Sequence, residues 1–199
     1  MKKHILISVK NGCLFWFILG MCSCAPSYVP NVINTPMFKQ AGELQGAAHT
    51  GISGFDPQVS YAITENIGLM VNGSFANQTS DTTDNYHKHS FIEAGVGFYK
   101  NYRSIGVFEV YGGYGMGTLN AFYENDLWSD QENVKTNRLF LQPAVGINTG
   151  YFIGSLSPRL VYVNLLQEPE SLDGIFIEPV LTGKLGLPYV KMTLQVGFS

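Results

Sequence analysis

The sequence predicts an all-β fold, an antiparallel up-and-down transmembrane β-barrel of eight to ten strands. Eight stretches between Phe55 and Phe198 alternate apolar residues with small or polar residues at period two, the pattern of strands with two different faces. The small or polar face carries few charges, whereas a solvated face is normally rich in Lys, Arg, Asp and Glu. Small residues fit a narrow interior, so we expect the polar face to point inward and the apolar face to contact lipid.

The predicted strands follow one another from residue 55 onward. Residues 55–63 and 67–75 are joined by a tight turn at Glu65 and Asn66, and the alternation is cleanest in residues 190–198. The other five strong alternations cover residues 92–98, 108–116, 139–147, 156–162 and 175–185. Residues 43–50 form a weaker candidate strand. Including them gives nine strands, whereas bacterial barrels normally have an even number.

The connections between these strands are alternately short and long. Short turns are expected near Glu65, Asn101, Gly150 and Pro188, and longer polar loops at residues 77–87, 119–135 and 167–174. Membrane barrels have this organisation, with short turns on one side of the bilayer and long loops on the other.

Aromatic residues gather near both ends of the predicted strands, where two belts at the membrane interfaces are expected. Those near short turns or at the end of the last strand are Tyr61, Phe98, Tyr99, Tyr102, Tyr151, Phe152, Tyr189 and Phe198. Those near the long loops are Phe75, Phe91, Phe122, Tyr123, Trp128 and Phe176.

The first residues of the chain have the features of an export signal. Three lysines precede an apolar run at residues 13–21, which is of signal-peptide length and too short to span a bilayer. The three lysines are Lys2, Lys3 and Lys10. Residues 1–23 are therefore predicted to be a signal peptide.

The end of this signal resembles a bacterial lipoprotein box, in which a small residue precedes the cysteine that is cleaved and acylated. Ser23 before Cys24 fits this requirement, and Cys22 is the alternative acylation site. An ordinary secretory signal with incidental cysteines is a further alternative. Residues 24–42 are rich in Pro and Asn and are predicted to link the anchor to a barrel at residues 43–199.

The charge of the chain bears on its possible partners, and its cysteine content bears on how the fold is stabilised. Removing residues 1–23 takes away three of the 12 basic residues and none of the 15 acidic ones, which leaves a net charge of about −6. Because the chain carries no basic stripe, we expect no nucleic-acid partner. All three cysteines precede residue 25, so the barrel is predicted to be stable without disulfides.

At this point the chain resembles small outer-membrane β-barrels of the OmpA/OmpX kind, and more closely the barrels with lipoprotein signals that are common in Bacteroidetes. The segments that carry the resemblance are residues 22–24, 28–31, 108–115, 176–179 and 194–199. The last of these is similar to the signal read by the outer-membrane assembly machinery, although Ser199 follows the terminal aromatic residue. The resemblance implies an outer-membrane location and assigns no biochemical role.

Charged residues on the predicted inner face are of both signs. Such charges survive in a confined interior only when they are paired, because an unpaired buried charge costs several kcal/mol. We therefore expect an ion network inside the barrel, and independently solvated charges are the alternative. The predicted network consists of Glu93, Glu109, Arg138, Arg159, Glu178, Lys184 and Lys191.

Candidates for catalysis or metal binding are weak. His87 and His89 would face one way on a strand and could hold a metal with Asp84, although two histidines in a polar loop are more often solvated. Ser90 beside His89, with Glu93, is the one conceivable hydrolase set, but sequence neighbours on a strand point to opposite faces. We predict no catalytic residue, no metal and no cofactor.

Four acidic residues crowd one predicted loop. They are Glu124, Asp126, Asp130 and Glu132. Such a group could bind Ca²⁺ weakly, but a solvated acidic loop is the simpler interpretation.

These observations predict an outer-membrane β-barrel lipoprotein with a filled lumen, acting structurally or in adhesion or interaction through its long loops. Its expected partners are outer-membrane lipid, the outer-membrane assembly machinery and an unidentified extracellular partner. The first alternative is an outer-membrane lipid-modifying enzyme or a narrow channel. The second is a periplasmic lipocalin-like barrel, which has the same alternation with its apolar face inward.

Overall fold

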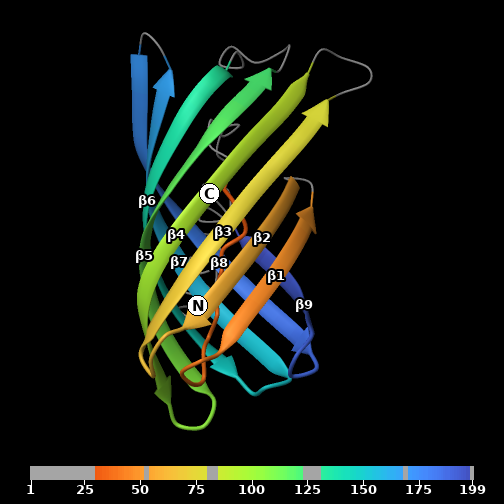
Figure 1. The fold of residues 1–199 in the computed structure, drawn as a ribbon, viewed down its shortest axis with the longest axis vertical. Helices are drawn as coiled ribbons and strands as arrows, with labels where there is room; N and C mark the ends of the chain where they lie inside the picture. Colours follow the sequence, from red (N-terminus) through yellow and green to blue (C-terminus); the bar gives the residue numbers. More distant parts are fainter. Residues whose placement is uncertain (1–29, 52–53, 80–84, 123–130, 168–169, 198–199) are drawn as a thin grey trace, which may run out of the picture.

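The computed structural model describes residues 30–51, 54–79, 85–122, 131–167 and 170–197, with side-chain positions for most of them. Nine strands form one antiparallel sheet whose spatial order is the chain order (Figure 1). They are β1 (Leu44–Gly51), β2 (Gly54–Ala62), β3 (Ile67–Thr79), β4 (Tyr86–Tyr102), β5 (Gly106–Phe122), β6 (Gln131–Asn148), β7 (Phe152–Gln167), β8 (Glu170–Gly186) and β9 (Lys191–Gly197). The predicted all-β, antiparallel up-and-down fold is confirmed, and the weak candidate at residues 43–50 is a strand, β1.

Among the described residues, no helix is long and apolar enough to cross a membrane.

The sheet curls around an interior that is formed by its polar face. Glu93 and Arg138 are only 1% and 7% exposed, whereas Val59, Leu141 and Leu194 are 53%, 50% and 73% exposed on the outer face. Period-two alternation places these two sets on opposite sides of each strand. The predicted orientation, with charges inward and apolar side chains outward, therefore holds.

The two edge strands of the curled sheet do not pair with each other. No Cα atom of β1 lies within 8 Å of a Cα atom of β9, whereas paired strands lie about 4.8 Å apart. Every neighbouring pair is antiparallel and the strand number is odd, so β1 and β9 run in the same direction. The described strands thus form a curled sheet with an open seam.

The strands extend into all three predicted loops, in the parts of these loops that the structure describes. β3 continues to Thr79 and β4 begins at Tyr86, while β7 and β8 are paired up to Gln167 and Glu170. The predicted loop at 119–135 likewise includes the end of β5 and the start of β6. Residues 123–130 lie outside the described residues. The prediction was wrong here because it followed the outward apolar residues. Backbone pairing continues where outward positions become polar, as at Lys88 and Lys135.

The predicted short turns lie between strands at Glu65, Gly150 and Pro188. The fourth turn is at residues 103–105, because Asn101 is still paired in β4.

Three aromatic residues assigned to the interfacial belts instead face the interior. Tyr99 and Phe91 are buried, and Phe176 packs against the buried apolar cluster. Each is a sequence neighbour of an outward apolar residue, so alternation turns it inward. Tyr102, Tyr151 and Tyr189 are exposed on the outer side near short turns. Tyr123, Trp128 and Phe198 lie outside the described residues.

Residues 30–40, called the inner segment below, run through the interior of the curled sheet. Asn31 bonds to Glu93 near the loop end of the outer apolar face, and Lys39 bonds to the carbonyl of Ser104 in a short turn. The segment therefore descends from the loop end to the turn end before the chain enters β1 (Figure 1). Sequence analysis assigned residues 24–42 to a linker. Within that range, residues 30–40 instead fill the interior of the sheet.

Side chains or backbone groups of the inner segment bond to every one of the nine strands. The strand residues that make these bonds are Gln45, Gln58, Asn72, Glu93, Glu109, Gln142, Ser155, Lys184 and Gln195, one from each of β1 to β9. Because the inner segment is hydrogen-bonded to each strand in this way, the segment and the sheet fix each other's position.

Inward glycines make room for large inward side chains. The Tyr111 ring lies across the positions where Gly97 and Gly68 would carry a Cβ atom, and Phe38 of the inner segment packs over Gly68. Phe140 similarly occupies the space over Gly113. The glycine-rich inner face is therefore a packing surface for aromatic rings.

Replacing Gly97 with alanine should destabilise the fold, because the new methyl group collides with the Tyr111 ring and the Val110 carbonyl. Overpacking of this kind costs about 1–3 kcal/mol. Gly112→Ala is the matched control, since the nearest atom to its Cβ would be 3.7 Å away. Urea unfolding in detergent micelles should show a lower midpoint for Gly97→Ala alone. Equal midpoints for the two variants would contradict this packing.

Candidate functional site inside the curled sheet

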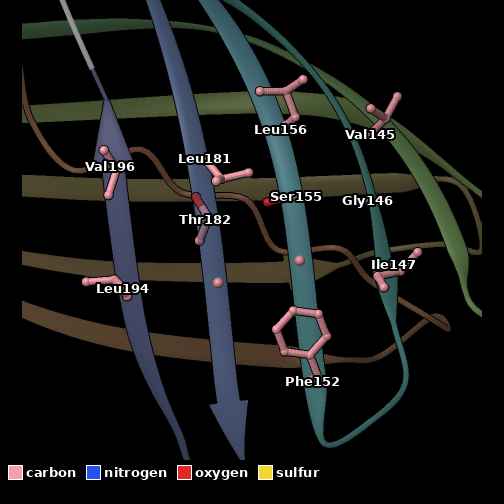
Figure 2. A pocket seen from close by; sticks show the side chains of 12 residues that line it. Val145, Gly146, Ile147, Phe152, Ser155, Leu156, Leu181, Thr182, Leu194 and Val196 are labelled. Carbon is pink, nitrogen blue, oxygen red and sulfur yellow. The ribbon is translucent and has the colours of Figure 1, made fainter.

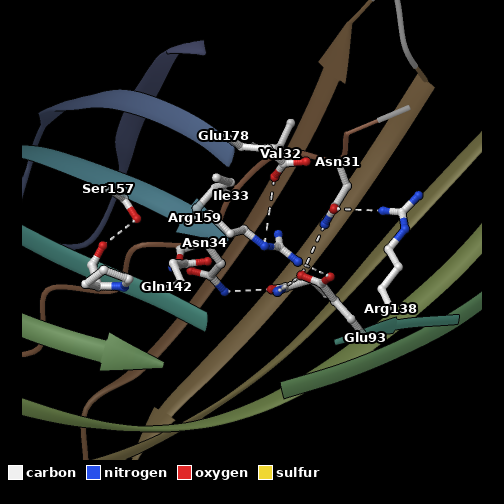
Figure 3. Close-up of polar contacts among 12 residues, drawn as sticks. Asn31, Val32, Ile33, Asn34, Glu93, Arg138, Gln142, Ser157, Arg159 and Glu178 are labelled. Atoms are coloured by element: carbon white, nitrogen blue, oxygen red, sulfur yellow. Dashed lines mark hydrogen bonds and ion pairs between the residues drawn. The ribbon is translucent and has the colours of Figure 1, made fainter. Parts of the chain in front are cut away.

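A fully buried arginine lies at the centre of the interior. Arg159 of β7 donates from its Nη2 to Glu93 Oε2 of β4 at 2.6 Å, and its Nε lies 4.0 Å from Glu178 Oε2 of β8 (Figure 3). The side chains of Arg159 and Glu93 are not exposed, and that of Glu178 is 2% exposed. These three predicted network residues are brought together by the curvature of the sheet.

Aromatic rings complete the surroundings of the two inner arginines. The guanidinium of Arg159 lies over the Phe140 ring at 4.3 Å, and that of Arg138 lies over the Phe91 ring at 3.8 Å. A cation over an aromatic face is attracted by the ring quadrupole, and the attraction is stronger when the pair is desolvated.

The inner segment supplies hydrogen bonds to the same cluster. Glu93 Oε1 accepts from Asn72 Nδ2 at 2.9 Å and from Asn31 Nδ2 at 3.2 Å. Asn31 Oδ1 in turn accepts from Arg138 at 3.3 Å, so this asparagine links a buried acid to a buried base. Asn34 joins the group by donating to Asn72 Oδ1 at 2.8 Å (Figure 3). The two arginines and two glutamates form a set with no net charge.

The other predicted network residues lie nearer the turn end. Glu109 accepts from the Met37 backbone N–H at 2.9 Å, and Lys184 donates to the Thr35 carbonyl at 2.8 Å. These two charges also act on each other electrostatically. Lys191 departs from the prediction: its ammonium is exposed and bonds to the Pro188 carbonyl, because it lies at the open edge of the sheet.

Sequence analysis missed the uncharged partners in this site. Asn31 and Asn34 fall in the predicted linker, and the sequence analysis gave no role to Asn72 or Gln142. The high content of Asn and Pro before the first strand was the sequence feature that could have pointed to these asparagines. Asparagine can donate and accept at once, which suits bridging positions between charges of opposite sign.

His87 and His89 face the interior of the sheet and contact each other. His87 Nε2 lies 2.9 Å from His89 Nδ1, and His89 Nε2 lies 2.9 Å from Ser74 Oγ of β3. Ser90, the serine considered from sequence, is on the exposed side of β4. Within the described part of the chain, no group of three or more His, Cys, Asp or Glu could hold a metal.

Several residues singled out from the sequence have no described side chain. They are Cys22, Cys24, Asp84, Glu124, Asp126, Asp130 and Glu132.

A shallow groove of about 440 Å³ crosses the outer face of β6 to β9 (Figure 2). Outward glycines Gly154 and Gly183 leave it open, and Phe152, Leu181 and Leu194 flank it. It is part of the outer apolar face and holds no charged residue.

Comparison of the chain with protein-family models, curated proteins and solved structures gave no match.

Removing the central cation should destabilise the protein strongly. Arg159→Met removes the guanidinium that the buried Glu93 and Glu178 share, and breaking a buried pair in this way costs about 3–5 kcal/mol. Lys191→Met removes an exposed ammonium and should change stability by less than about 0.5 kcal/mol. Guanidinium unfolding followed by circular dichroism compares the two. A similar small effect of both substitutions would show that the cluster does not hold the interior together.

Proposed function

We propose that this chain is an outer-membrane β-barrel lipoprotein, acylated at Cys24 or alternatively Cys22, that acts structurally or in adhesion or interaction through its loop end. The carrying observation is the opposite polarity of the two sheet faces. Charges are buried inside, whereas apolar side chains are exposed outside on all strands from β2 to β9. In water such an outer face would be a very large exposed apolar patch, which soluble monomers rarely carry.

The outer apolar run of a central strand has the number of residues that a tilted strand needs to cross a bilayer. On β5 the outward run from Phe108 to Met116 covers roughly 26 Å along the strand and contains no charge. Polar outward residues, Lys88, Thr118 and Lys135, follow on the loop side. Exposed tyrosines mark the turn side. An outward apolar band with aromatic and polar borders is typical of membrane barrels.

The polarity of the interior argues against the lipocalin-like alternative. Such a barrel binds its ligand in an apolar interior. Here the interior holds the buried charges and the inner segment, which makes hydrogen bonds to all nine strands. The same filling argues against a channel, because the space near the axis is occupied by protein.

The strands beyond the apolar face support an interaction role at the loop end. β4 continues from Ile92 to Tyr86, and β5 from Met116 to Phe122, so the paired strands extend roughly 20 Å, measured along the strand, beyond the apolar run. A paired extension of this kind would present its connecting segments away from the lipid, where a partner can reach them.

Membrane integration should survive loss of the lipid anchor. Residues 1–24 are replaced by a cleavable secretory signal without cysteine, and membranes are washed with carbonate before detergent extraction. We expect the variant to stay in the pellet and to need detergent, as the unaltered chain does. Release by the carbonate wash would contradict the membrane-spanning proposal and favour a periplasmic barrel.

The filled interior should block solute passage. Liposomes that contain the purified full chain and an entrapped small dye should leak no faster than empty liposomes. Rapid dye release that depends on the protein would support the narrow-channel alternative and contradict the filled-lumen proposal.

A further inference from the structure

Three polar side chains contact one another in a row on the inner face, between the arginine cluster and the loop end. The proposed function gives them no role. They are Ser74 on β3 and His89 and His87 on β4, joined by two contacts of 2.9 Å. Ser74 is buried and the two histidines are half-buried. Alternate residues of a strand share a face, so both imidazoles point to the same side.

We propose that Ser74, His89 and His87 form a nucleophilic site that hydrolyses short-chain carboxylic esters. An activated serine needs a base within about 2.6–3.2 Å and a third group that orients the base. His89 meets both conditions, because its Nε2 contacts the serine oxygen and its Nδ1 contacts His87 Nε2. When Nδ1 carries the proton and donates it to His87, Nε2 is left to accept the Ser74 proton.

Neighbouring groups supply the other parts of such a site. Burial, with smaller contributions from His87 and Arg138, lowers the pKa of His89 to about 4, so its imidazole is neutral. The Arg138 guanidinium covers Phe91, the register partner of Ser74. A positive charge here would stabilise the oxyanion of a tetrahedral intermediate.

The class of substrate follows from the apolar residues beside the histidines. Leu119 and Ala121 of β5 are the register partners of His89 and His87, and they belong to one buried apolar cluster with Val134. An acyl group would lie against these side chains. Because Ser74 is only 4% exposed, a short acyl chain fits better than a long one.

The reaction balances with water as the second reactant. Ser74 Oγ bonds to the ester carbonyl carbon and its proton moves to His89 Nε2. The carbon–oxygen bond to the alcohol then breaks, and the alcohol leaves with that proton. Water attacks the acyl-serine and gives a proton to His89, and Ser74 recovers that proton as the acid is released.

The first test uses a small alkyl fluorophosphonate on the purified full chain. Ser74 Oγ should bond to phosphorus with loss of fluoride, and mass spectrometry of the digested chain should place the adduct on Ser74. Ser74→Ala should reduce labelling at least tenfold, and Ser90→Ala, an exposed serine on the same strand pair, should label like the unaltered chain. No adduct on the unaltered chain, or an adduct elsewhere, overturns the proposal even if Ser74→Ala fails to fold.

The second test separates the base from its positioning partner. With p-nitrophenyl acetate, His89→Gln should lower kcat/KM about 100-fold, the range for loss of a general base. His87→Ala should lower it about tenfold, and His87→Gln should recover most of this loss, because its amide oxygen can accept from His89 Nδ1. Heat-modified gel mobility reports folding in parallel. Unchanged hydrolysis in folded His89→Gln would also overturn the proposal.

Discussion

A guanidinium without any contact with solvent is the constraint on which the interior depends. Desolvating an ion costs several kcal/mol, so Arg159 is tolerable only while Glu93, Glu178 and the Phe140 ring surround it. Together with Arg159, these groups come from four different strands, and they meet only if the sheet curls. Glu93 in turn needs Asn72 and Asn31 for its second oxygen. The charge cluster therefore couples the curvature of the sheet to the position of the inner segment.

Packing reinforces this coupling from the turn side. Phe38 of the inner segment stacks obliquely on Tyr99 at 5.4 Å between ring centres, and both rings belong to the main buried cluster with Tyr111. Glycine at positions 68 and 97 gives these rings space that any Cβ atom would take. The interior is thus polar near Arg159 and aromatic towards the turns, and the inner segment serves both regions.

Much of the fold could be predicted from the sequence, because alternation is a local property of each strand. It placed the apolar residues outside and Glu93 inside, and it included Arg159 and Glu178 in the expected ion network without pairing them. The inner segment could not be predicted in this way, since residues such as Asn31 and Met37 follow no period. Nor could the contact of Ser74 with His89, which depends on the β3–β4 register. The seam between β1 and β9 depends on how far the whole sheet curls, which no single segment encodes.

The span of the inner segment's contacts bears on how the chain reaches its native state. Ile33 exchanges two hydrogen bonds with Gln195, although 162 residues separate them. Contacts this distant in sequence form slowly, because a long loop must be closed before they contribute. The inner segment can therefore take up its final position only after β9 has formed. Until then the buried charges have incomplete partners, and nascent sheets would be exposed to misassembly.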